Sequence, residues 1–126
     1  MITAVPLDWT GGQPRLVVHC CQACGHTWYL PRQACPACGC TRVTPVISAG
    51  AGVVVASTTV WRRVDRSGDG AMPVGIALVD LDEGGRAMGR CRPETVVGAR
   101  VRAAFITEQA EDGGDRLLPM FELEDQ

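Results

Sequence analysis

The chain has 126 residues, of which 46% are hydrophobic and 21% are charged. This balance is typical of a folded globular protein and excludes collagen-like, coiled-coil and disordered classes. No apolar run approaches the roughly 20 residues of a membrane-spanning helix, so we expect no membrane partner. Residues 1–12 hold neither a basic segment nor an apolar stretch. We therefore expect no secretory signal and a cytoplasmic location.

The charges are unevenly distributed, and all twelve basic residues are arginine. Residues 1–107 hold eleven arginines and seven acidic residues, whereas residues 108–126 hold one arginine and seven acidic residues. Duplex-binding domains usually have a pI above ~9, and this chain has a pI near 5.6. The pattern favours a small phosphate-bearing ligand over a long nucleic acid.

Four of the seven cysteines form two Cys-x-x-Cys pairs, and each pair is followed by a glycine. The first pair is Cys21 and Cys24, and the second, ten residues further on, is Cys35 and Cys38. Zinc prefers a tetrahedron of thiolates, and a closed shell of four leaves no position for water or substrate. The spacing therefore predicts a structural Zn²⁺ site.

The other three cysteines carry a weaker signal. Cys20 and Cys40 adjoin the two pairs, and we expect them to lie outside the metal shell. Cys91 stands in a strand-like segment far from any histidine in sequence, which favours a buried and inert thiol. Iron on the four paired cysteines, as in an electron-transfer rubredoxin, stays open as an alternative.

The residues around the first pair favour a ribbon of short strands. A thioredoxin-like site requires a helix after the pair. Residues 26–30 are instead β-branched and aromatic, and they end at Pro31. They are predicted as the return strand of a hairpin that begins at residues 16–18. So small a segment has too little core to fold without its metal.

Residues 46–123 have the alternation and turn signals of a β-domain. The predicted strands are residues 52–63, 74–82, 86–92, 99–108 and 116–122. Glycine-rich turns are predicted at residues 65–70, 83–85 and 112–114. Residues 93–98 are predicted as a connector without strand character, with at most one helical turn. Three meander strands, a connector and two further strands are the order of the oligonucleotide/oligosaccharide-binding (OB) barrel.

The predicted fold is therefore all-β, with an N-terminal rubredoxin-like zinc ribbon followed by a five-stranded OB-fold barrel. The predicted divisions are a short N-terminal segment (1–15), the zinc ribbon (16–45), the barrel (46–123) and an acidic C-terminal end (124–126). Alternation also gathers arginines on one face of the third and fourth barrel strands. These arginines either form part of a solvent-exposed outer face of the barrel or present guanidinium groups suited to binding phosphate.

Several segments together resemble a known family over residues 9–123. They are the two Cys-x-x-Cys-Gly segments, the glycines before the first barrel strand, residues 73–84 (PVGIALVDLDEG), residues 97–101 (VGARV) and residues 118–121 (LPMF). This combination is similar to the zinc-ribbon/OB-fold family of acyl-coenzyme-A-associated proteins, long labelled a domain of unknown function. Residues 28–32 (WYLPR) stand where the family has an aromatic-Pro-Pro-Arg stretch, with Leu30 in place of the first proline.

The resemblance implies a non-catalytic accessory subunit in a hetero-oligomer. Family members assemble with thiolase-fold enzymes (thiolases, synthases, aldolases and acyltransferases), and some pair with hot-dog-fold hydratases. The barrel of such a subunit contributes to the coenzyme A channel, and the ribbon helps dock the partner.

The resemblance also suggests where ligand and partner would make contact. The expected contacts to the phosphates of a coenzyme A thioester are Arg62, Arg63, Arg90 and Arg100. Trp61 either stacks on the adenine or fills the barrel. Trp28, Tyr29 and Leu30 are expected as partner anchors, and the alternative for all three is packing within the ribbon.

The residues themselves carry no catalytic motif. Neither histidine lies in a recognisable triad, and no Gly-x-Ser-x-Gly or Walker-type loop occurs. A single-stranded nucleic-acid-binding protein remains an alternative, because ribbons and OB barrels are also used for that purpose. It would need aromatic stacking platforms worth ~1–3 kcal/mol per base, and the barrel has only Trp61, Phe105 and Phe121.

Overall fold

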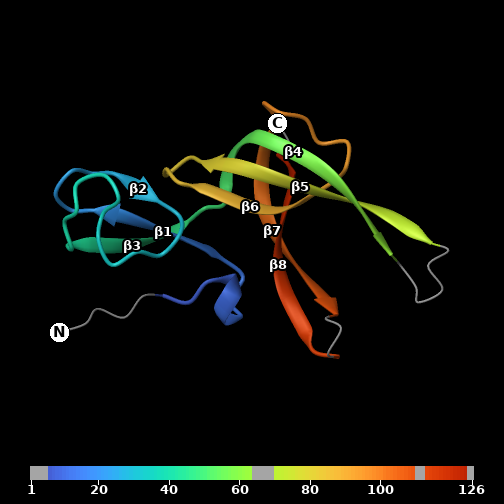
Figure 1. Cartoon of the computed structure of the whole chain (residues 1–126), viewed down its shortest axis with the longest axis horizontal. Coiled ribbons are helices and arrows are strands. Elements are labelled where there is room, and N and C mark those ends of the chain that lie inside the picture. Colours follow the sequence, from blue (N-terminus) through green and yellow to red (C-terminus); the bar gives the residue numbers. More distant parts are fainter. Residues whose placement is uncertain (1–5, 64–69, 110–112, 125–126) are drawn as a thin grey trace.

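The computed structural model describes residues 6–63, 70–109 and 113–124, and strands dominate it (Figure 1). A short 3-10 helix, η1 (Trp9–Gly11), precedes them. The strands are β1 (Leu16–Cys21), β2 (Thr27–Trp28), β3 (Val43–Ser48), β4 (Ala51–Arg63), β5 (Ala71–Leu81), β6 (Arg86–Cys91), β7 (Arg100–Gln109) and β8 (Asp115–Leu123). Within the described ranges no helix is long and apolar enough to cross a membrane.

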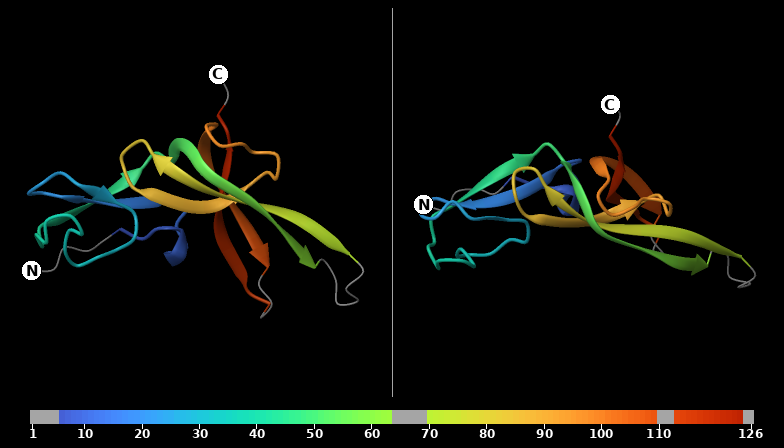
Figure 2. Two further views of the ribbon diagram at one scale, coloured as in Figure 1. Left: turned by 45° about the horizontal axis from the view of Figure 1, so that its top comes forward. Right: turned by 90° about the horizontal axis from the view of Figure 1, so that it is seen from above.

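The strands form two sheets that match the predicted fold class. The first three strands make an antiparallel sheet in the order β2-β1-β3, and the other five close a barrel in the order β4-β5-β6-β8-β7. The barrel is closed by a parallel pair, β6 with β8. The views in Figures 1 and 2 show the ribbon at one end and the barrel beside it. The prediction of an all-β ribbon and barrel is confirmed.

The five barrel strands lie within three residues of their predicted ends, and residues 93–98 form turns rather than a helical turn. Residues 64–69 and 110–112 lie outside the described part, so the predicted tip at residues 65–70 and the start of the turn at residues 112–114 are not described there. Strand β3 was not predicted, because it contains Pro45. Proline is tolerated there because β3 is an edge strand. This strand crosses the predicted boundary at residue 45, and the division into domains stays a prediction.

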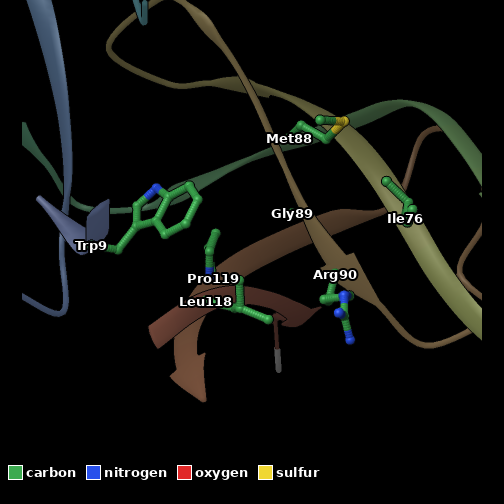
Figure 3. A pocket seen from close by; sticks show the side chains of 7 residues that line it. All are labelled: Trp9, Ile76, Met88, Gly89, Arg90, Leu118 and Pro119. Atoms are coloured by element: carbon green, nitrogen blue, oxygen red, sulfur yellow. The ribbon is translucent and has the colours of Figure 1, made fainter. Parts of the chain in front are cut away.

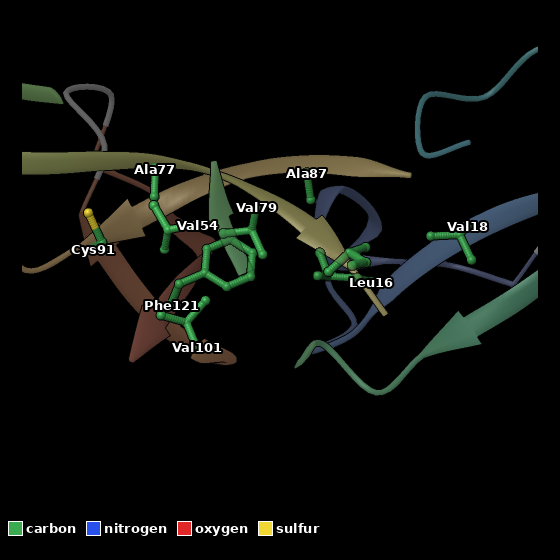
Figure 4. Close-up of a cluster of buried hydrophobic side chains, with 10 residues drawn as sticks. Leu16, Val18, Val54, Ala77, Val79, Ala87, Cys91, Val101 and Phe121 are labelled. Carbon is green, nitrogen blue, oxygen red and sulfur yellow. The ribbon is translucent and has the colours of Figure 1, made fainter. Parts of the chain in front are cut away.

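Ribbon and barrel share one hydrophobic core. Leu16 and Val18 of β1 belong to the same buried cluster as the barrel side chains (Figure 4). The barrel members are Val54, Ala77, Val79, Leu81, Ala87, Cys91, Val101 and Phe121. Because β1 serves both units, the ribbon is held against the barrel by buried apolar surface.

The turn between β5 and β6 packs against the ribbon strand β2. Gly84 and Gly85 in this turn have φ values of 110° and 90°, a region that favours glycine. A Cβ on Gly84 would lie 2.8 Å from Cβ of Thr27, and one on Gly85 would lie 3.0 Å from the backbone nitrogen of Tyr29. The close approach therefore depends on two glycines in sequence.

Glu83 fastens the same turn to the segment that joins ribbon and barrel. Its carboxylate accepts hydrogen bonds from Oγ of Ser48 at 2.7 Å and from the backbone N–H of Ala49 at 2.8 Å. Burial raises the pKa of this carboxyl, but the hydrogen bonds from Ala49 and Ser48 outweigh it and lower the pKa below its usual value. The ionised form therefore stabilises the junction.

We expect Glu83→Gln to lower the free energy of unfolding by about 1 kcal/mol at neutral pH, since it removes two charge-assisted hydrogen bonds from a solvent-screened site. The pKa of Glu83 is lower in the folded than in the unfolded state. Its contribution to the free energy of unfolding is therefore fully present above the unfolded-state pKa of about 4.3, and it is lost as the pH falls through the folded-state pKa. Urea titrations of both proteins over a pH series should show the difference shrinking on acidification. Glu94→Gln, at an exposed glutamate, should change little, and an equal loss in that control would contradict the assignment.

Candidate functional site

The four paired cysteines converge as a single cluster. Their sulfur atoms all lie within 4.8 Å of one another. The Sγ–Sγ distance is 3.6 Å between Cys21 and Cys38 and 3.7 Å between Cys24 and Cys35. A zinc tetrahedron with Zn–S bonds near 2.3 Å has sulfur–sulfur edges of about 3.8 Å. The cluster therefore fits a metal ion such as Zn²⁺.

The backbone forms the two halves of this cluster in the same way. The N–H of Ala23 donates to Sγ of Cys21 at 3.4 Å, and the N–H of Ala37 donates to Sγ of Cys35 at 3.3 Å. Each turn is closed by a glycine whose N–H bonds to the carbonyl of the first cysteine of its pair. This arrangement directs amide dipoles at the sulfurs, which is suited to thiolates.

The thiols cannot all be ionised without a cation among them. Burial raises the pKa of Cys35, but backbone N–H groups of Cys38 and Ala37 outweigh it and bring the pKa to about 7. The backbone N–H of Cys40 lowers the pKa of Cys38, yet hydrogen bonds with the thiols of Cys21 and Cys24 raise it to about 12. A bound dication would remove this conflict by compensating the negative charges.

The side chains next to the cluster have structural contacts instead. Cys20 and Cys40 lie outside the group of four, as predicted. Trp28 is only 7% exposed, and it packs with Cys21 and Cys35. The two histidines, His19 and His26, stack on Trp28 with ring-centroid distances of 6.1 Å and 5.7 Å.

The three expected partner anchors lie in three different environments. Trp28 is buried in the ribbon, which is the alternative that the sequence left open. Tyr29 packs against the barrel core, and its hydroxyl accepts a hydrogen bond from Nε1 of Trp9 at 2.8 Å. Leu30 is 63% exposed. Of the three, Leu30 therefore has the most surface to offer a partner, and the anchor assignment stays a prediction.

Two of the expected phosphate contacts meet at Glu108. Arg90 makes two hydrogen bonds to this carboxylate, at 2.8 Å and 3.0 Å, and Arg62 makes one at 2.7 Å. Arg116 approaches it to 3.8 Å. Arg90 first, and then Arg62, hold the pKa of Glu108 down to about 2. We call these four residues the Glu108 cluster, in which three guanidinium groups approach one carboxylate.

Arg116 and Glu108 were not singled out in the sequence, yet a signal for them exists. They face each other in the β7–β8 hairpin, and they stand equally far from Asp112 at its turn. Counting outward from that turn would have paired them. The role of Glu108 in gathering arginines from β4 and β6 needs the closed barrel and could not be counted in this way.

Arg100 lies in a separate place. It makes two hydrogen bonds to Asp82, at 2.7 Å and 2.8 Å, and it reaches Glu124 at 3.4 Å. It pairs with Val53 near the start of β4, whereas Arg62 lies near the end of that strand. The structure therefore separates Arg100 from Arg62 and Arg90. The side chain of Arg63 lies outside the described part.

Trp61 does not fill the barrel, since it is 70% exposed. It lies opposite Pro73 on the β4–β5 hairpin, which projects away from the barrel on the side opposite the ribbon (Figure 1). Of the two possibilities that the sequence left open, this position excludes the one in which Trp61 fills the barrel. Stacking on an adenine stays a prediction.

A recess of about 180 Å³ opens where β6 and β8 meet (Figure 3). Its walls are Trp9 of η1, Ile76 of β5, Met88 and Arg90 of β6, and Leu118 and Pro119 of β8. Arg90 belongs to both the recess and the Glu108 cluster. Trp9 received no role from the sequence, because nothing in the pattern shows that η1 covers the barrel.

The ribbon with its cysteine cluster and the closed barrel define a zinc-ribbon/OB-fold protein. Residues 46–105 match the family model of the ChsH2 C-terminal OB-fold domain. The chain is also 32% identical over 100 residues to a DUF35 domain-containing scaffold protein of Methanocaldococcus jannaschii, which covers 74% of this chain and 70% of that protein. The chain belongs to the DUF35 family, as the resemblance in its sequence predicted.

Solved structures agree with this assignment. A chain of the Ltp2-ChsH2(DUF35) aldolase superposes with a TM-score of 0.66 and 27% identity, over 86% of this chain and 84% of that one. A DUF35-family protein of unknown function from Sulfolobus solfataricus superposes with a TM-score of 0.59 and 21% identity, over 87% and 76% of the two chains. The second likeness shows the fold alone.

We expect Cys24→Ser or Cys38→Ser to release the metal and leave the ribbon unfolded. Zinc sites of this kind contribute roughly 10–16 kcal/mol at neutral pH, far more than the small ribbon core can supply. Elemental analysis should give one zinc per chain, and amide NMR spectra of the variants should lose dispersion for residues 16–45. Cys20→Ser and Cys91→Ser are matched controls that should keep the metal. A well-folded wild-type chain without metal would contradict the prediction.

Proposed function

We propose that this chain is a non-catalytic accessory subunit that assembles with a thiolase-fold enzyme and contributes to binding its acyl-coenzyme A. The observation that carries the proposal is the superposition on a chain of the Ltp2-ChsH2(DUF35) aldolase, which extends over most of both chains. The relative described as a scaffold protein supports it independently. The acyl substrate would then be chosen largely by the partner.

The chemistry of the described residues supports an accessory role. Four thiolates around one metal leave no open coordination position, so such a centre cannot activate water. Both histidines stack in the ribbon, away from the barrel thiol Cys91. Burial first of all raises the pKa of Cys91, which makes its thiol a poor nucleophile. The reacting groups would therefore come from the partner.

The Glu108 cluster is the part of the expected phosphate site that the geometry favours. Arg62, Arg90 and Arg116 bring three guanidinium groups to one carboxylate, and guanidinium forks bind phosphate oxygens well. Arg62 and Arg90 were both expected there, and Arg116 joins them. Arg100 is a weaker candidate, because Asp82 and Glu124 already balance its charge.

The β4–β5 hairpin is the surface that best fits a partner subunit. Thr59–Arg63 pair with residues 71–75, beyond the part of β4 that pairs with β7. The large apolar side chains Val60, Trp61 and Met72 are exposed on it. A two-stranded hairpin with exposed apolar side chains is marginally stable alone and is typical of an interaction surface. Leu30 on the ribbon would offer a second contact.

The nucleic-acid alternative gains no support from the barrel. Phe121 is fully buried and Phe105 packs against the core, so neither ring is placed as a stacking platform. Trp61 is the one aromatic side chain of the described barrel with a largely exposed ring.

Co-expression with a thiolase-fold enzyme from the same genome should give a complex that co-elutes in size-exclusion chromatography. A stable interface of this kind buries on the order of 1,600 Å². Trp61→Ala should weaken the complex at least several-fold, because buried tryptophans are frequent hot spots. Ala56→Ser, on the same strand, is a control that should leave it intact. Separate elution and an unchanged rate of the enzyme would count decisively against the assembly.

In that complex, Arg62→Ala and Arg90→Ala should each raise KM for acyl-coenzyme A by about 5- to 20-fold, the equivalent of one charge-assisted contact. The effect on kcat should be small, since a remote phosphate contact stabilises ground and transition states alike. Arg102→Ala is the matched control, because Arg102 pairs with Glu124 and does not belong to the Glu108 cluster. Unchanged KM in both variants at low salt would remove the phosphate site from the Glu108 cluster and leave the assembly itself untouched.

A further inference from the structure

The recess beside Trp9 exists because the barrel closes over a very short distance. Strands β6 and β8 pair only at Arg90 with Met120 and at Cys91 with Phe121. Before these two pairs the ladder between β6 and β8 is absent, and the recess there is bounded by Met88 on one side and Leu118 on the other (Figure 3). A gap at this position is therefore built into the closure of the barrel.

Two residues keep the floor of the recess apolar and close to the core. A Cβ on Gly89 would lie 2.7 Å from the ring of Phe121 and 3.0 Å from the carbonyl oxygen of Pro119. Glycine is thus required for β6 to pass so near the core. Pro119 has no N–H to pair, and its ring is fully buried.

Trp9 forms the opposite wall and is held in place. Its Nε1 donates to the hydroxyl of Tyr29 at 2.8 Å, and Asp8 caps η1 by accepting from the N–H of Thr10 at 2.9 Å. The indole is therefore fixed at the edge of the recess, with its polar atom already bonded. In another protein, an apolar cavity of about 150 Å³ binds benzene. The 180 Å³ here is enough for one aromatic ring or a short branched chain.

The rim of the recess is positively charged. The guanidinium of Arg90 is half-buried and belongs to the Glu108 cluster, in which three arginines face one carboxylate. Partial burial strengthens the attraction of this group for an anion compared with a fully solvated charge. An apolar pocket with a cationic rim favours a ligand with an apolar body and an anionic head.

We propose that this recess binds a small apolar or aromatic carboxylate, with the ring between Trp9 and Met88 and the carboxylate toward Arg90. The site goes beyond the proposed function, since it requires neither a partner subunit nor coenzyme A. Arg90 is shared with the proposed phosphate site, and the same guanidinium group would attract the carboxylate of the small ligand.

The test is a titration of 4-fluorobenzoate with the isolated, zinc-loaded chain, followed by ¹⁹F NMR. We expect saturable binding with a Kd of about 1 mM, as befits about ten heavy atoms. Ligand protons should show nuclear Overhauser contacts to the ring of Trp9. The neutral isostere 4-fluorobenzamide should bind at least several-fold more weakly, and high salt should weaken the acid but not the amide.

Variants at the rim separate the site from a general attraction of benzoate to arginines. Met88 is 59% exposed, so Met88→Glu leaves the core intact and should weaken binding about 10-fold by repulsion, while Met88→Gln should not. Arg90→Ala should weaken binding to a similar extent, and Arg100→Ala should leave it unchanged. Amide spectra check that each variant is folded.

Three results would overturn the site. They are no saturable binding at roughly ten times the expected Kd, equal affinity of the wild type, Met88→Glu and Arg90→Ala, or ligand contacts to Trp61 in place of Trp9. Because the isolated chain is used without coenzyme A, none of these results depends on whether the subunit assembly exists. Failure of the assembly would likewise leave this site standing.

Discussion

Four sulfur atoms within 4.8 Å of one another can be ionised together only around a cation. A shared cation would therefore connect the two Cys-x-x-Cys-Gly turns. Cys21, the first of the four cysteines, is also the last residue of β1. Strand β1 in turn carries Leu16 and Val18 into the core shared with the barrel. A metal at the cysteine cluster therefore fixes the ribbon and, through one strand, one end of the barrel core.

The second connection between the two units is polar. Glu83 holds the β5–β6 turn to the segment after β3, and two adjacent glycines let that turn approach β2. Apolar burial through β1 and this polar contact both hold the ribbon to the barrel. Together they hold the ribbon surface that carries Leu30 in a fixed position relative to the projecting β4–β5 hairpin.

Six arginines of the described barrel form ion pairs with carboxylates, and these pairs are unevenly distributed. Arg86 pairs with Asp80, and Arg100 and Arg102 share Asp82 and Glu124. Glu108 instead faces three arginines. Arg90 first, and then Arg62, lower the pKa of Glu108. Three guanidinium groups gathered next to an apolar recess make this face of the described barrel chemically distinct.

The sequence by itself determined the parts that depend on local spacing. Two Cys-x-x-Cys-Gly turns specify the metal cluster, and period-two alternation with glycine turns specified all five barrel strands to within three residues. Alternation also puts Ala77, Val79 and Leu81 on one face of their strand, because successive side chains of a strand point to opposite faces. The structure shows that this face is the buried one. The family followed from the order of these local motifs.

Only the tertiary structure decided which distant side chains meet. Alternation put Arg90 and Arg100 on the outer faces of neighbouring predicted strands, but barrel closure through β6 and β8 sent them to different carboxylates. Trp28 and Leu30 are two residues apart, yet one is buried and the other exposed, because the loop leaves β2 between them. Trp9 and the recess depend on η1 folding back over the barrel. Such contacts arise from the path of the whole chain, and no local pattern encodes that path.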